Sequence, residues 1–450
     1  MDRAARVLAM GVVAFAGVVG TIGRIGLFGD GAHFLFNMRL SDSFYFGNQN
    51  RVLVAGVTQL PALAAMQLQV FDGDSLILLY SAGVAGIPAT VWAIALWLQR
   101  RESLFWVFAL MWACVYPVTG FFAVGEYNLT YALVGLTMSV TARPGRMSAG
   151  EAVCVAVISA VLLRSYESMV FLGPIVVVAL ALRLRQSWNI SGTSRFELIL
   201  TRALAITAMV LLVVGSVGAV VATFSTLAPS AGGTVDTATS LPSLARDPRV
   251  VLSSLCAVCF IVAGAVRTRA VGILLVAVAG GSAVLLVLTP LAPAAIDSID
   301  AKWPYPWMYY QARIAAGVIL AMLLVVVIVV RFARTEAVDR FKAGLGSAWV
   351  IPALLILAMG IDFTRSCLEF RNWVGEFAQV VQADQGPILL EMSGIDPRYA
   401  WQWTNPTLSL LFWSETGQGV VLNAQNYRGW QPFDPTTDAQ GLGEQILGRN

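Results

Sequence analysis

Long apolar runs alternate with short polar segments along the whole chain of 450 residues. A membrane-spanning helix needs about 20 mostly apolar residues, and eleven segments come close to that length. We therefore expect an all-α polytopic membrane protein with about eleven transmembrane helices. The predicted spans are residues 7–28, 74–98, 103–121, 124–141, 149–163, 168–182, 199–225, 250–266, 270–290, 312–330 and 346–361.

The composition supports a membrane protein and excludes several other classes. The chain is 58% hydrophobic and 12% charged, about half the charged fraction of a soluble protein. This excludes an ordinary cytosolic enzyme, a disordered chain and a nucleic-acid-binding protein. The net charge of +3 is too small to imply a polyanionic partner. The five cysteines have neither a disulfide pattern nor metal-ligand spacing.

The arginines predict how the chain is oriented in the membrane. They cluster in alternate connections between the spans, and such loops face the cytoplasm. An odd number of spans then places the N-terminus in the cytoplasm and the C-terminus outside. We therefore expect a multi-pass protein of a plasma membrane such as the bacterial inner membrane. The arginine-bearing connections lie near residues 3–6, 100–101, 143–146, 183–195, 267–269 and 331–342.

Two parts of the chain differ in character. Residues 1–361 form the predicted transmembrane domain, with a long outer loop at 29–73. Residues 362–450 form a tryptophan-rich C-terminal unit outside the membrane. Its segments GPILLEM and QGVVLNA are typical of short strands, so this unit is expected to be a small mixed α/β structure.

The outer loop 29–73 carries the first candidate site residues. Asp30 follows directly on the first span, and His33 is the only histidine of the chain. Arg51 opens an apolar stretch at 51–69 that is too broken to span and that we expect to lie flat at the membrane surface. His33 either binds substrate or fills a packing and hydrogen-bonding role, and one histidine cannot build a zinc site.

Three further charges fall at membrane depth. Glu126 has apolar neighbours on both sides and either serves function or opens a helix, where an acidic residue is favourable. Arg164 and Glu167 lie between two short spans, three residues apart, a spacing that allows them to pair on one helix face. That pair either lines a cavity or anchors a helical hairpin.

The outer loop before the tenth span mixes aromatic and cationic side chains. Lys302, Tyr309 and Arg313 lie in the segment DSIDAKWPYPWMYYQARIAAG. Aromatic belts occur at membrane interfaces in general. Cations beside tyrosines are also suited to holding a lipid phosphate, for which arginine has the bidentate geometry.

The layout of an outer-loop acid, an interfacial helix, about eleven spans and an outward C-terminal unit resembles the GT-C superfamily, whose members are membrane glycosyltransferases that use polyprenyl-phosphate sugars. The resemblance implies an inverting sugar transfer on the extracytoplasmic face, with Asp30 as the base that accepts the acceptor proton. It also implies that Lys302, Tyr309 and Arg313 hold the lipid phosphate, while His33, Arg51, Glu126, Arg164 and Glu167 shape the donor site.

The implied partners are a polyprenyl-phosphate lipid, the bilayer and a glycan, lipid or protein acceptor, and no nucleic acid. No cofactor is certain beyond the lipid-linked donor, and the need for a divalent metal stays open. A polytopic transporter or lipid flippase is one alternative, in which Glu126, Arg164 and Glu167 would line an ion or substrate path. A non-catalytic membrane scaffold is the other.

Overall fold

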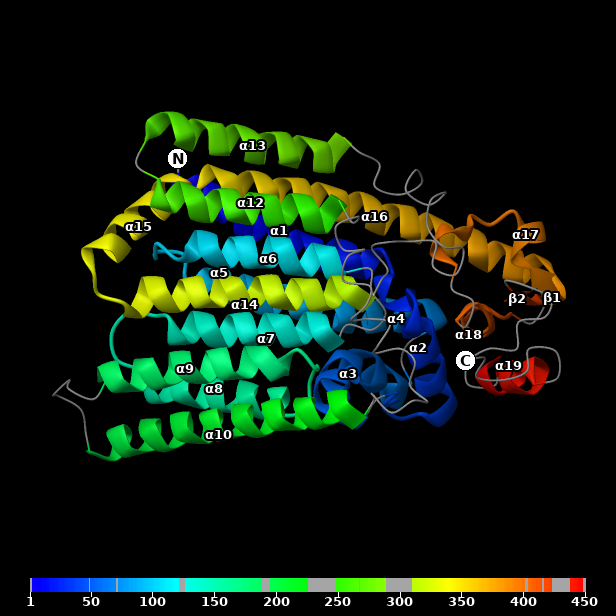
Figure 1. Cartoon of the computed structure of the whole chain (residues 1–450). Coiled ribbons are helices and arrows are strands. Elements are labelled where there is room, and N and C mark those ends of the chain that lie inside the picture. The colour runs from blue at the N-terminus through cyan, green and yellow to red at the C-terminus, as the bar shows by residue number, and fades with distance from the viewer. Residues whose placement is uncertain are drawn as a thin grey trace.

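The computed structural model of the chain is a bundle of long, side-by-side helices with a smaller unit at one end (Figure 1). It describes residues 2–447 except 48, 70–71, 121–125, 188–194, 226–247, 267, 289–309, 401–403, 415–416 and 423–437. The N-terminus lies at the end of the bundle opposite to the smaller unit (Figure 1).

A helix occupies each of the eleven segments predicted from the sequence. The bundle helices are α1 (Asp2–Ile22), α4 and α5 (Gly73–Ser81, Ile87–Leu98), α6 (Phe105–Thr119), α7 (Glu126–Thr141), α8 (Ala149–Leu162), α9 (Met169–Ser187), α10 (Arg195–Ser225), α12 (Pro248–Ala265), α13 (Arg269–Leu288), α14 (Tyr310–Phe332) and α16 (Val350–Ala383).

Eight of the described helices are long and apolar enough to cross a membrane. Those eight are consistent with a multi-pass membrane protein. They include Gln49–Leu68, which we had expected to be too broken to span, and they omit α6, α7, α8 and α12 as too short. The helices α6 and α7 are nonetheless buried on every side, so they form the centre of the bundle.

Two helices of the first predicted outer loop lie across the bundle end rather than along it (Figure 1). They are α2 (Asp30–Ser41) and α3 (Val52–Leu68), each preceded by a short 3-10 turn, at Ile25–Leu27 and Gln49–Arg51. The predicted break at 51–69 is absent because Pro61 is accommodated inside α3. The helix α3 packs on α4 and on the π-helical turn Ala82–Gly86 that joins α4 to α5.

Local sequence signals explain several of these helix ends. Ser148 and Glu151 form a capping box that starts α8. The Asp72 side chain accepts a hydrogen bond from the Ser75 amide and caps α4. Thr335 caps α15 (Glu336–Ser347), a polar helix at the N-terminal end of the bundle.

The predicted boundary at residues 361/362 falls inside α16, which continues as one helix of 34 residues to Ala383. Both predicted strands are present, as β1 (Gln385–Leu389) and β2 (Gln418–Leu422), which pair in parallel. The remaining elements of this unit are α17 (Leu390–Ser393), a 3-10 turn (Pro397–Tyr399), α18 (Asn405–Leu411) and α19 (Ala439–Leu447).

The C-terminal unit has an aromatic core and packs against the first outer loop. Trp373 of α16 stacks on Phe370 and lies against Phe377 and Tyr399. The helix α18 contacts both β2 and α2. Trp373 and Trp413 are therefore core residues, whereas Trp401, Trp403 and Trp430 lie outside the described residues.

Candidate functional site

Arg51 binds two carboxylates that come from distant parts of the chain. Its Nη1 donates to Glu126 Oε2 at 3.0 Å, and its Nε and Nη2 donate to Glu167 Oε1 at 3.0 and 2.7 Å. The Arg51 guanidinium also lies 4.9 Å from the centre of the Tyr166 ring, a cation–π distance. The three charges therefore form one cluster, named here the Arg51 cluster.

The Arg51 cluster is largely withdrawn from solvent and carries a net charge of −1. The side chain of Glu126 is 3% exposed and that of Glu167 is 28% exposed. Desolvation of such charges is costly, so it needs well-formed hydrogen bonds to offset it. Glu167 Oε2 is nevertheless buried without a hydrogen-bond partner among the described residues.

The end of α6 fixes the first turn of α7, where Glu126 lies. The Tyr127 hydroxyl donates to the Thr119 carbonyl at 3.1 Å, and the Thr119 hydroxyl donates to the Asn128 side chain. At a helix N-terminus the backbone dipole favours the charged form of a carboxylate. Glu126 is therefore both a helix-start residue and a member of the cluster.

Asp30 is the first residue of α2, and two glycines set its position. Gly29 has a φ of 55°, which favours glycine. At Gly31 an added Cβ would lie 1.8 Å from the Gly26 carbonyl oxygen, so only glycine fits there. The segment Phe28-Gly-Asp-Gly thus turns sharply and presents Asp30 at the bundle end.

Tyr80 of α4 is buried near two of the candidate carboxylates. The carboxylates of Asp30 and Glu126 are both close enough to its hydroxyl to act on it electrostatically. That hydroxyl is fully buried and has no hydrogen-bond partner in the described part of the chain. The adjacent Ser81 accepts a hydrogen bond from the Gly26 amide at 3.2 Å, which ties α4 to the turn before α2. The sequence did not single out Tyr80, because a tyrosine within an apolar span is usually a packing residue.

His33 forms its polar contacts within α2 and with the segment that follows this helix. Its Nε2 is 3.2 Å from the Tyr45 hydroxyl, and the Asn37 side-chain amide donates to the His33 carbonyl at 2.7 Å. Burial lowers the pKa of His33, and the nearby Asp30 carboxylate opposes that shift. Burial likewise raises the pKa of Tyr45. His33 thus has hydrogen-bonding neighbours of the kind that its structural alternative requires, and its part in substrate binding stays a prediction.

The expected pairing of Arg164 with Glu167 is wrong. Helix α8 ends at Leu162, so both residues lie in the turn before α9 and no helix face joins them. Arg164 is exposed there, and within the described residues Glu167 is paired with Arg51 instead. The expectation that this junction is pulled into the membrane and lines a cavity stays a prediction.

The predicted phosphate-binding residues cannot be compared with this site. Lys302 and Tyr309 lie outside the described residues. Arg313 belongs to the first turn of α14, but the structure does not describe its side chain. Their role stays a prediction.

A second buried ion cluster was not predicted. Asp362 of α16 forms an ion pair with Arg249 at 2.7 Å and accepts a hydrogen bond from Arg365 Nη2 at 2.9 Å, and Arg249 Nη2 donates to the Ser366 hydroxyl. The Asp362 side chain is 2% exposed. The i, i+3 spacing of Asp362 and Arg365 indicates an ion pair on one helix face. The sequence analysis did not use it, because the predicted span ended at residue 361, before both of them.

A cavity of about 290 Å³ opens between the first outer loop and the C-terminal unit. Arg39 of α2, Asp72 and Asp74 at the start of α4, and Gln382 and Trp413 of the C-terminal unit line it. Carboxylate, amide, guanidinium and aromatic groups thus meet beside the helix that carries Asp30. No group of three or more metal-ligating side chains occurs in the part of the chain that the structure describes.

Comparison with known proteins adds no assignment. No protein-family model, no curated protein and no solved structure matches this chain. The functional argument therefore depends on the geometry of the site.

Proposed function

We propose that the protein is a multi-pass membrane glycosyltransferase of the GT-C kind, which transfers a sugar from a polyprenyl-phosphate donor to an acceptor on the extracytoplasmic face. In this proposal the N-terminus is cytoplasmic and eleven helices cross the membrane. The observation that carries it is the buried Arg51 cluster at the bundle end crossed by α2 and α3, where the Asp30 and Glu126 carboxylates both act electrostatically on the buried Tyr80 hydroxyl.

The proposed reaction is a single inverting displacement. The Asp30 carboxylate accepts the proton of the acceptor hydroxyl, and the freed oxygen attacks the anomeric carbon of the sugar. The bond between that carbon and the phosphate oxygen breaks, and the phosphate leaves with the electron pair. Lys302 and Arg313 would stabilise this leaving phosphate, with Tyr309 as a hydrogen-bond donor.

The Arg51 cluster has a positioning role in this scheme. Arg51 is held by two carboxylates and therefore supplies no surplus positive charge for a phosphate. It joins α3 to α7 and to the turn before α9, so it fixes the interfacial helix over the bundle. The cavity beside α2 suits a polar acceptor such as a glycan, because it combines hydrogen-bonding groups with an aromatic wall.

The test is sugar transfer in reconstituted vesicles that contain radiolabelled polyprenyl-phosphate sugars and cell-envelope acceptors. Asp30→Asn keeps the side-chain shape and removes the base, so the rate of transfer should fall by about 10²–10⁴-fold. Asp42→Asn is the matched control, an exposed carboxylate directly after α2 and outside the lining of the cavity, and it should leave the rate unchanged.

Full transfer by Asp30→Asn would refute the base assignment. Movement of a solute or lipid across the vesicle membrane, without any lipid-linked sugar, would favour a transporter instead. A scaffold would show neither activity in the unmodified protein.

A further inference from the structure

The cavity beside α2 takes its lining from three parts of the chain that are far apart in sequence. Arg39 belongs to α2, Ile77 to α4, and Trp413 to the segment that follows α18. Contacts between α18 and α2 hold two of these parts together. The volume of about 290 Å³ is at the lower end of the range of about 300–1,000 Å³ for ligand sites, so the cavity suits one small ligand.

Part of this lining is apolar. Ile77, Leu411, Phe412 and Trp413 supply it. The Trp413 indole N–H donates to the Gly419 carbonyl at 3.0 Å, so it is already satisfied inside the C-terminal unit. The ring carbons are therefore what the Trp413 side chain offers to a ligand, and an aromatic surface of this kind packs against apolar groups.

The polar part of the lining offers mainly hydrogen-bond acceptors. A carboxylate has about four acceptor positions, and Ser75 is the only donor to Asp72 within the described residues. The Asp74 side chain is 66% exposed and forms an ion pair with Arg24 at 3.3 Å. The Gln382 side chain donates through Nε2 to a backbone carbonyl at 3.4 Å, which leaves its Oε1 as an acceptor.

A ligand that matches this lining has hydrogen-bond donors along one edge and an apolar face. Phosphates and carboxylates bring acceptors only, so they match the oxygens of Asp72, Asp74 and Gln382 poorly. An acyl chain would leave the same oxygens without donors. A pyranose ring has both features, because its hydroxyl groups donate at the edge while its C–H bonds form an apolar face.

We propose that this cavity binds a pyranose sugar, whose hydroxyl groups donate to Asp72, Asp74 and Gln382 and whose C–H face packs against Trp413. If the protein is the glycosyltransferase proposed above, this sugar is the acceptor, and that identification alone rests on the proposed function. The acceptor is then a glycan of one or two sugar units at its bound end, and not a protein. The C-terminal unit supplies part of the site that selects it.

The test is saturation-transfer difference NMR on the full chain in phosphatidylglycerol nanodiscs, which contain no glycoside detergent. The probes are the methyl pyranosides of glucose, galactose and mannose, with glycerol as a polyol that lacks the ring. We expect saturation transfer to the ring C–H protons of at least one glycoside, and weaker transfer to glycerol.

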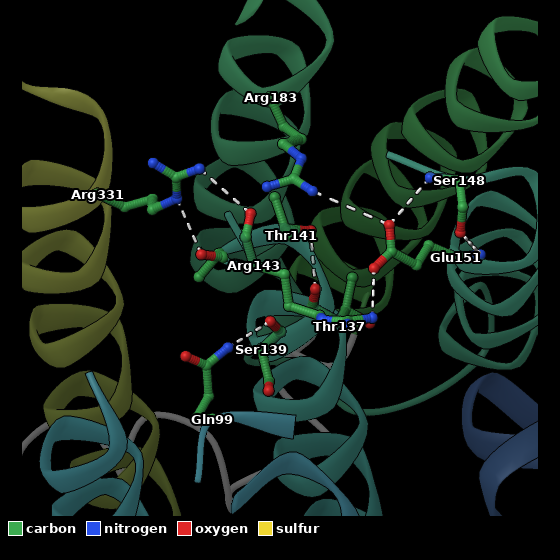
Figure 2. A network of polar contacts seen from close by, with 10 residues as sticks. Gln99, Thr137, Ser139, Thr141, Arg143, Ser148, Glu151, Arg183 and Arg331 are labelled. Atoms are coloured by element: carbon green, nitrogen blue, oxygen red, sulfur yellow. Dashed lines mark hydrogen bonds and ion pairs between the residues drawn. The ribbon is translucent and has the colours of Figure 1, made fainter. Parts of the chain in front are cut away.

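Gly73→Leu blocks the cavity without a change of any polar group. An added Cβ at Gly73 would meet only Arg39 Nη1, at 3.9 Å, and both residues line the cavity. Binding should be lost while the melting temperature stays equal or rises, because glycine is a poor helix former. Gly150→Leu is the matched control, in the first turn of α8 beside Ser148 and Glu151 (Figure 2), where nothing lies within 4 Å of an added Cβ. It should leave binding unchanged.

Asp72→Asn tests the polar edge of the cavity. Asparagine caps a helix as well as aspartate does, so α4 should keep its start. Hydrogen bonds to a charged group are about twice as strong as neutral ones, so the affinity for the glycoside should fall about tenfold.

Three results would overturn the proposal: no saturation transfer to any of the glycosides, equal transfer to glycerol, or unchanged binding by Gly73→Leu. Sugar-transfer assays separate this inference from the proposed function. If the cavity holds the acceptor, Gly73→Leu raises the KM for the acceptor, and an unchanged KM would overturn that identification. Glycoside binding by an unmodified protein that transfers no sugar would refute the proposed function and support the sugar site.

Discussion

Removal of Arg51 should destabilise the protein far more than removal of a surface cation. Arg51→Met keeps the apolar stem and deletes the guanidinium, so Glu126 and Glu167 lose the cation that they share. Loss of one partner from a buried ion pair costs about 3–5 kcal/mol. Glu167 is 28% exposed and can recover some hydration, whereas Glu126 at 3% cannot, so we expect the lower end of that range, about 3 kcal/mol.

The size of this effect should depend on the two carboxylates. Glu126→Gln with Glu167→Gln in the Arg51→Met background removes both stranded charges. Replacement of a whole buried ion cluster by neutral side chains of similar volume is often close to neutral. The triple variant should therefore recover most of the free energy of unfolding that the single variant loses. Arg51→Lys should lie between, because an ammonium cannot reproduce the three hydrogen bonds of the guanidinium.

The assay is reversible unfolding in mixed micelles with increasing SDS, followed by circular dichroism. Lys342→Met is the control, because Lys342 pairs with an exposed Asp339 at 3.5 Å and should be worth less than about 1 kcal/mol. A loss below about 1 kcal/mol for Arg51→Met would refute the reasoning, since the cluster would then behave as a surface pair. A triple variant less stable than the single variant would refute it as well.

Four further outcomes are expected. Burial holds the pKa of His33 below its ordinary value of 6.5, so its contribution to stability should be complete above that pH and fall as the pH drops below it. His33 is the only histidine, so His33→Gln should flatten the melting temperature between pH 7 and about pH 5. Tyr80→Phe removes a buried hydroxyl that has no hydrogen-bond partner within the described residues, so thermal melts should show equal or higher stability. Gly83→Ala places a Cβ 1.8 Å from the Thr58 carbonyl oxygen, so calorimetry should show a loss of about 1–3 kcal/mol or no folded protein. Asp362→Asn weakens a carboxylate that binds two arginines, and SDS unfolding should show a loss of about 3 kcal/mol.

Apolar run length predicted the positions of the bundle helices and of both strands, because those depend on local sequence. It did not predict which side chains meet. The i, i+3 spacing allows Glu167 to pair with Arg164, but that rule holds only on an unbroken helix. The turn after Leu162 breaks that helix, and Arg51, 116 residues away, takes the place of Arg164.

The candidate site could be predicted only in part, because the sequence shows which charges are isolated among apolar residues but not which side chains meet. Asp30, Arg51, Glu126 and Glu167 attracted attention as isolated charges in apolar surroundings, and three of them form one cluster. Tyr80 and Asp362 did not, since the role of each depends on what the neighbouring helices bring to it. Hydrophobic periodicity identifies a helix but carries no information about its neighbours.

The unbroken length of α16 determines how far the C-terminal unit lies from the bundle and in which direction it faces. Thirty-four residues at 1.5 Å per residue give a rod of about 51 Å, against a hydrocarbon core of about 30 Å. Were α16 to cross a bilayer along its normal, about 20 Å of rigid helix would extend past the hydrocarbon core. One residue inserted into that part would lift the unit by about 1.5 Å and turn it by about 100°, which would swing α18 away from α2. The number of residues in this part of α16 thus sets the distance between the C-terminal unit and the helix bundle.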